Sequence, residues 1–173
     1  MIRREKFLFK GVESLPEYWK VYFSLSKIGK EYEILWNDED ILGKGETLIM
    51  SNTEYEWKTN LRFLNQIKEG DKILSLGYGI GLIVPEVKKR GGILTVIEKD
   101  QEVINLEKNL DPDLEIIMGD INQMDFKIFG DRKFDLIFSD ITEINQRVND
   151  LEKLLFKEKG LIYWEHLGEN LND

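Results

Sequence analysis

One stretch of the sequence decides the fold: Lys72-Ile73-Leu74-Ser75-Leu76-Gly77-Tyr78-Gly79-Ile80-Gly81. Its first five residues are mostly apolar, which is typical of a strand buried in a sheet. The glycines that follow predict a tight turn, because glycine adopts backbone conformations that other residues avoid. Glycine also lacks a Cβ, so the main chain can approach a ligand closely. We therefore expect Gly77, Gly79 and Gly81, with Tyr78 between them, to bind a ligand.

The spacing of these glycines argues against a dinucleotide coenzyme. A nicotinamide or flavin fingerprint reads Gly-x-Gly-x-x-Gly, which would require the last glycine at position 82. That position is Leu82, and starting the pattern at Gly79 places Val84 at the last glycine site. The turn therefore indicates another kind of ligand.

Outward from this turn, strand and helix patterns alternate regularly. Further strands are expected at 93–97, 114–118, 134–138 and 161–164. Helices are expected to begin near Pro85, Asp100 and Thr142. This alternation predicts an α/β fold with a Rossmann-like, doubly wound, mostly parallel sheet. Ligands of such sheets bind at the carboxyl ends of the strands.

The first part of the chain has a different pattern, so we divide the chain into residues 1–52 and a core of residues 53–173. In the first part, a capping box at 14–17 (Ser-Leu-Pro-Glu) predicts a helix. Short strands of a hairpin are expected at 32–36 and 47–50. This segment is expected to form a small lid or to cover an edge of the core sheet.

Acidic residues follow the predicted core strands. Glu98 ends the second strand, 21 residues after Gly77, and Asp120 and Asp140 follow the third and fourth strands. A carboxylate about 20 residues after such a glycine turn can accept hydrogen bonds from both hydroxyls of a ribose. Acidic groups would repel a diphosphate and attract a positive centre such as a sulfonium.

These segments together resemble the class I S-adenosylmethionine-dependent methyltransferase superfamily. The resemblance covers about 90 of the 173 residues and rests on motifs at the ends of the core strands. The motifs lie at 73–81, 96–100, 118–121 and 134–140. The resemblance implies S-adenosylmethionine as cofactor, with the glycine turn, Glu98 and Lys99 in its site. It also implies that Asp120 binds the adenine amine, that Ile121 packs beside the ring, and that catalytic Asp140 faces the substrate.

The chain departs from the superfamily pattern in three ways. Ser75 stands where an acidic residue is usual, two positions before the first glycine. The fourth motif lacks the Asn-Pro-Pro-aromatic run of enzymes that methylate amino groups of nucleic acids, which argues against that class. The superfamily usually continues past its fifth strand, whereas this sequence ends seven residues after His166. We therefore expect a core truncated at one sheet edge, covered either by residues 1–52 or by a second copy in a homodimer.

Narrower similarities leave the reaction open. The chain is faintly similar to spermidine synthases and to guanidino-group methyltransferases, and on that basis Tyr55 and Glu56 are candidate substrate-binding residues. The first hypothesis is methyl transfer to a small acceptor that contains an amine. The alternatives are aminopropyl transfer and a module that binds the nucleoside without catalysis. Simpler structural roles also remain open: Glu56 as a capping-box member, Asp120 as a turn former and Asp140 as a helix cap.

Composition excludes several kinds of site and partner. There is no cysteine and a single histidine, so thiolate catalysis and zinc sites built from Cys or several His are excluded, and we expect no bound metal. Lys and Arg number 24 against 33 Asp and Glu, a net charge of −9 that argues against binding nucleic acid. No apolar run reaches the length of about 18 residues that a membrane span needs. We expect a cytoplasmic protein that acts on a small molecule.

Overall fold

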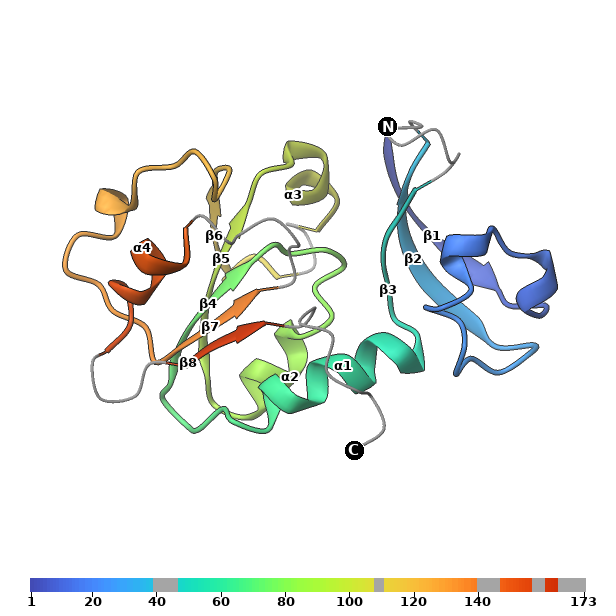
Figure 1. Cartoon of the computed structure of the whole chain (residues 1–173), viewed down its shortest axis with the longest axis horizontal. Helices are drawn as coiled ribbons and strands as arrows, with labels where there is room; N and C mark the ends of the chain where they lie inside the picture. Colours follow the sequence, from blue (N-terminus) through green and yellow to red (C-terminus); the bar gives the residue numbers. More distant parts are fainter. Residues whose placement is uncertain (39–46, 108–110, 140–146, 157–160, 165–173) are drawn as a thin grey trace.

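The computed structural model describes residues 1–38, 47–107, 111–139, 147–156 and 161–164 (Figure 1). The described strands form a three-stranded sheet near the N-terminus and a five-stranded sheet in the rest of the chain. The glycine turn belongs to the larger sheet.

The five-stranded sheet confirms the predicted α/β core. Its strands are β4 (Lys72–Leu76), β5 (Ile93–Glu98), β6 (Glu115–Met118), β7 (Leu136–Ser139) and β8 (Leu161–Trp164). Their order is β6-β5-β4-β7-β8, and every neighbouring pair is parallel. Parallel sheets are stable when both faces are covered, and β4 at the centre is apolar on both of its faces.

Helices cover both faces of this sheet (Figure 1). They are α1 (Glu54–Leu64), α2 (Val84–Lys89), α3 (Gln101–Glu107) and α4 (Val148–Glu152). Ile73 packs in one core cluster with residues of α1, α2 and α3. The next residue, Leu74, packs in a second cluster with Leu151 of α4 and with Phe129, which lies in the 3-10 turn η3 (Phe126–Phe129). Successive strand residues point to opposite faces, which is why the chain builds two clusters.

One predicted helix is shorter than expected. Apolar residues at Val148, Leu151 and Leu155 predict a helix that reaches Leu155. Instead α4 ends at Glu152, and Leu155 forms a parallel bridge with Phe134, just before β7. The expected cap, Thr142, lies outside the described residues. Burial of Leu155 against the sheet is more favourable than one more helical turn on the surface.

The three-stranded sheet contains β1 (Ile2–Leu8), β2 (Glu31–Asn37) and β3 (Thr47–Ser51), all antiparallel. Pairing of β2 with β3 confirms the predicted hairpin, whereas β1 was not expected from the sequence. No strand of this sheet pairs with β8 among the described residues. Whether a second copy covers the β8 edge stays a prediction.

The helix expected from Ser14 onward is wrong. The structure has two 3-10 turns, η1 (Val12–Ser14) and η2 (Glu17–Trp19), followed by further turns. The Ser14 hydroxyl donates to the Gly11 carbonyl at 2.9 Å instead of capping a helix. Trp19 and Phe23 are buried, their rings stack on each other, and they pack in one cluster with aromatic residues of β1 and β2. Tertiary packing therefore overrides the local helix signal.

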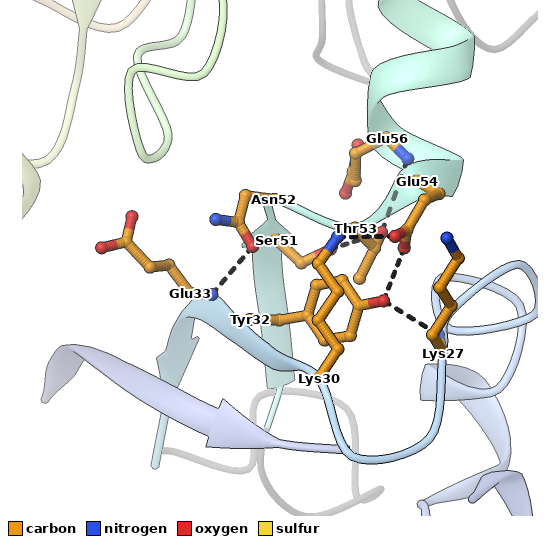
Figure 2. Close-up of polar contacts among 9 residues, drawn as sticks. All are labelled: Lys27, Lys30, Tyr32, Glu33, Ser51, Asn52, Thr53, Glu54 and Glu56. Atoms are coloured by element: carbon orange, nitrogen blue, oxygen red, sulfur yellow. Dashed lines mark hydrogen bonds and ion pairs between the residues drawn. The ribbon is translucent and has the colours of Figure 1, made fainter.

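Hydrogen bonds join the small sheet to the first turn of α1 (Figure 2). The Tyr32 hydroxyl donates to Glu54 Oε2 at 2.7 Å and accepts from the Lys27 amide at 2.9 Å. Lys30 Nζ lies 2.6 Å from Glu54 Oε1. Thr53 caps the helix by accepting from the Glu56 amide, as the capping-box pattern Thr-Glu-Tyr-Glu at 53–56 predicts. We call Lys30, Tyr32 and Glu54 the junction cluster.

The junction cluster shifts the titration of its carboxyl group. Burial of Glu54 acts to raise its pKa, but hydrogen bonds from Lys30 and Tyr32 outweigh this and lower the pKa below the usual 4.5. A carboxyl group with a lowered pKa in the folded state stabilises the fold above its unfolded pKa. That contribution is lost as the pH falls through the folded value.

The first prediction concerns the Tyr32 hydroxyl. Tyr32→Phe is expected to lower the free energy of unfolding by about 1–3 kcal/mol, because Glu54 loses a charge-assisted hydrogen bond. The matched control is Tyr18→Phe, since the Tyr18 hydroxyl is buried with no hydrogen-bond partner among the described residues. Urea denaturation should show no loss for that control. Equal losses in both variants would contradict the role of the junction cluster.

The second prediction concerns pH. Lys30→Met should destabilise the protein at pH 7, and the difference from the wild type should shrink as the pH falls below the usual carboxyl pKa of 4.5 and through the lowered pKa of Glu54. The control is Lys27→Met, because Lys27 contacts Tyr32 through its backbone amide. Denaturation curves at pH 3 to 7 measure both. A pH-independent effect of Lys30→Met would contradict the lowered pKa of Glu54.

Candidate functional site

The parallel strands bring the predicted ligand-binding residues to one edge of the sheet. The glycine loop (residues 77–81) leaves the carboxyl end of β4, and Glu98 is the last residue of β5 beside it. Gly77, Gly79 and Gly81 have φ values of 92°, 56° and 66°. These left-handed conformations strain any residue with a Cβ, so the loop requires its glycines.

The loop is also closely packed. A Cβ on Gly81 would lie 2.7 Å from the Tyr78 hydroxyl, because the buried Tyr78 side chain folds back over the loop. A Cβ on Gly79 would overlap the sulfur of Met50, a residue of β3. The close approach that the sequence predicted for a ligand is thus made here by a side chain of the N-terminal sheet.

Glu98 connects the turns that surround this edge. It is only 8% exposed. Its Oε2 accepts from the Tyr78 amide and its Oε1 from the Asp100 amide, each at 2.9 Å. Its carbonyl accepts from the Gly119 amide at 2.9 Å. Each carboxylate oxygen has two acceptor sites, so Glu98 retains capacity to accept from hydroxyl groups of a ligand.

Ser75 of β4 contacts the first residue of the same loop. Its hydroxyl is buried and donates to the Gly77 carbonyl at 2.9 Å. The residue that departs from the superfamily pattern therefore holds the first glycine of the turn in place. A neutral donor does here what a carboxylate could not, because a carboxylate would repel that carbonyl oxygen.

The remaining cofactor candidates lie near the same edge with different exposures. Lys99 is exposed, directly after Glu98. Asp120 is partly exposed and accepts from the Asn122 amide at 2.9 Å, the pattern of a turn former. The side chain of Ile121 is buried in the cluster that contains Leu76. Nothing in these positions tests contact with a nucleoside, so their roles stay predictions.

The candidate substrate residues lie in the first turn of α1. Tyr55 is partly buried, and its ring meets the ring of Tyr22 edge to face, with centroids 5.8 Å apart. Glu56 is buried, and its carbonyl accepts from Asn60 Nδ2 at 2.8 Å. Met50, six residues before Glu56, contacts the glycine loop. The structure therefore connects this turn to the ligand edge through β3.

Asp140, the candidate catalytic residue, and His166, the single histidine of the sequence, lie outside the described residues. Ser139, just before Asp140, is buried at the end of β7, and its hydroxyl has no hydrogen-bond partner in the described part of the chain.

Met50 is the residue near the glycine loop that the sequence did not predict. The only signal for it was Gly79, which marks a close approach without saying what approaches.

The structure also bears on metals and membranes. Within the described ranges, no group of three or more His, Asp or Glu side chains is arranged to hold a metal ion. In the same part of the chain, no helix combines the length and apolarity that crossing a bilayer requires.

Comparisons with known proteins identify the fold. No family model and no curated protein matches the chain. Among solved structures, it is similar to a TehB-like S-adenosylmethionine-dependent methyltransferase from Corynebacterium glutamicum, with 21% identity over 64% of this chain and 63% of that one, and a TM-score of 0.51. It is also similar to the YcgJ protein from Bacillus subtilis, with 12% identity over 61% of this chain and 49% of that one, and a TM-score of 0.50.

These shares mean that the chain spans about half to two thirds of the length of the two proteins. At such identities the similarity concerns the fold. It confirms the expectation of a Rossmann-like sheet of the kind found in class I S-adenosylmethionine-dependent methyltransferases.

Proposed function

We propose that this chain binds S-adenosylmethionine at the glycine loop and transfers its methyl group to a small acceptor that contains an amine. The observation that carries the proposal is the placement of Glu98. Its carboxylate lies between the loop after β4 and the turn after β5, with both oxygens aligned by backbone amides. This is where the superfamily resemblance places the group that holds the ribose hydroxyls.

The residues present fit this cofactor. The loop at Gly77, Gly79 and Gly81 carries no Cβ that would shield its main chain from a ligand, and the side chain that fills the space at Gly79 is Met50. The carboxylate of Glu98 is buried, carries a negative charge and contacts the loop at the Tyr78 amide. A negative group favours a sulfonium and disfavours a diphosphate at close range.

The chemistry divides between the cofactor and the chain. Bound S-adenosylmethionine supplies an electrophilic methyl group on a positively charged sulfur. The glycine loop would position the ligand, Glu98 would accept hydrogen bonds from its sugar hydroxyls, and Asp120 would accept from its adenine amine. Asp140 would orient the acceptor amine and take up its proton. Such a transfer depends mostly on positioning, so a rigid strand-end site is sufficient.

The acceptor class is supported by charge. The chain carries a net charge of −9, which attracts small cations over a distance. Glu56, the candidate substrate carboxylate, is buried in the first turn of α1. An amine that is protonated in solution would be attracted by the net negative charge of the chain and by the Glu56 carboxylate. It would release its proton only at the site.

The third prediction tests the cofactor site by calorimetry. Glu98→Gln should weaken binding of S-adenosylhomocysteine about 10- to 100-fold, or about 1.4–3 kcal/mol, because an amide is a poorer acceptor than a carboxylate. The control is Glu115→Gln at the amino end of β6, where Arg132 holds the carboxylate at 2.7 Å. Glu115→Gln should leave ligand affinity unchanged. Wild-type affinity in a folded Glu98→Gln variant would contradict the site.

The same measurement separates the candidate reactions. Methyl transfer predicts that S-adenosylmethionine and S-adenosylhomocysteine both bind. A strong preference for decarboxylated S-adenosylmethionine would select aminopropyl transfer instead. Binding of none of the three to the folded wild type would overturn the proposal.

A further inference from the structure

The backbone amides of the glycine loop have partners of two kinds. The Gly77 amide donates to the Ile97 carbonyl at 2.8 Å, and the Gly81 amide donates to the Tyr78 carbonyl at 2.9 Å. These bonds are part of the fold itself. The amides of Tyr78 and Ile80 are bound by side chains instead, and a side chain can rotate away without unfolding the turn.

Met50 is the side chain that binds the Ile80 amide. Its sulfur accepts this hydrogen bond at 3.3 Å and fills the space that Gly79 leaves by having no Cβ. Met50 is 5% exposed and packs in the core cluster with Tyr78 and Ile80. A thioether is a weak acceptor, so the Ile80 amide gains little from this partner compared with an oxygen acceptor.

An irregularity in the small sheet determines where Met50 points. In the pairing of β2 with β3, Leu35 lies opposite Met50 and Trp36 lies opposite Leu48, so the register shifts between them at Ile49. Ile49 is exposed, while Leu48 and Met50 on either side are both buried. A bulge of this kind re-aims a neighbouring side chain. Here Leu48 packs in the aromatic cluster of the small sheet, while Met50 packs in the cluster that contains Tyr78 and Ile80, so the shift directs Met50 against the glycine loop.

We propose that Met50 occupies the ligand's place at Ile80 and Gly79 in the ligand-free protein, and that nucleoside binding displaces it. The proposal rests on the proposed function, because it takes the glycine loop as the binding site. Met50, delivered by β3, then competes with the ligand for the loop. Since β3 belongs to the small sheet, the position of that sheet controls how readily the loop accepts a ligand.

Competition between Met50 and the ligand determines whether removing the Met50 side chain raises or lowers ligand affinity. If Met50 holds the loop in the ligand-free state, only the fraction of molecules with Met50 displaced can bind, and the measured affinity is reduced by that fraction. Removing the side chain removes the competitor. If Met50 instead formed a wall of the pocket, its removal would weaken binding.

The fourth prediction follows. Met50→Ala should tighten binding of S-adenosylhomocysteine on the order of three- to ten-fold in calorimetry. Met50→Leu preserves most of the volume beside Gly79 and should bind close to the wild-type level. Unchanged or weaker binding by folded Met50→Ala would overturn the inference. If S-adenosylhomocysteine binds neither the wild type nor Met50→Ala, the proposed function fails as well, which distinguishes the two.

A second measurement uses the wild type and so does not depend on a variant that folds. The chain has four methionines, so methyl labelling of methionine gives a simple spectrum. Without ligand, the Met50 methyl group should show nuclear Overhauser effects to Gly79. These should disappear on saturation with S-adenosylhomocysteine, while the signal of the exposed Met1 stays unchanged. Persistence of the Gly79 effects in the saturated complex would overturn the inference and leave the proposed function standing.

Discussion

The candidate site depends on one buried carboxylate, that of Glu98, which is bound by the amides of Tyr78 and Asp100. These two bonds join the glycine loop after β4 to the turn that starts α3. Charge-assisted hydrogen bonds of this kind are worth more than neutral ones, and their loss would leave a buried charge unpaired. Together with the bond from the Gly77 amide to the Ile97 carbonyl of β5, they fix the loop beside the end of that strand. The geometry of the ligand edge depends on this interaction.

The N-terminal sheet contributes to the same edge through two contacts. The junction cluster joins β2 to the first turn of α1, and Met50 of β3 reaches the glycine loop (Figure 2 shows the junction cluster). The small sheet is therefore more than an appendage to the α/β core. Its position sets which side chain meets the loop, so a part of the chain with no cofactor motif influences the place where a cofactor would bind.

The sequence predicted the core well because its signals are local and strong. Ile73, Leu74 and Leu76 form an apolar run that only a doubly covered strand explains, and all three are fully buried. Gly77, Gly79 and Gly81 predicted a turn with left-handed backbone directly after this strand, and the structure has that turn. The helix at Ser14 was wrong because the capping signal is local, whereas Trp19 and Phe23 pack against distant strands. Met50 was missed because its role depends on a register shift between strands that periodicity does not reveal.

The central claim is that Glu98 holds the sugar of a nucleoside cofactor at the loop after β4. A crystal structure of the protein with S-adenosylhomocysteine tests it most directly. The account predicts both ribose hydroxyls within hydrogen-bond distance of the Glu98 carboxylate, with the ligand over Gly79. A ligand bound elsewhere, or a ribose held by other side chains while Glu98 keeps only its two amide partners, would contradict it.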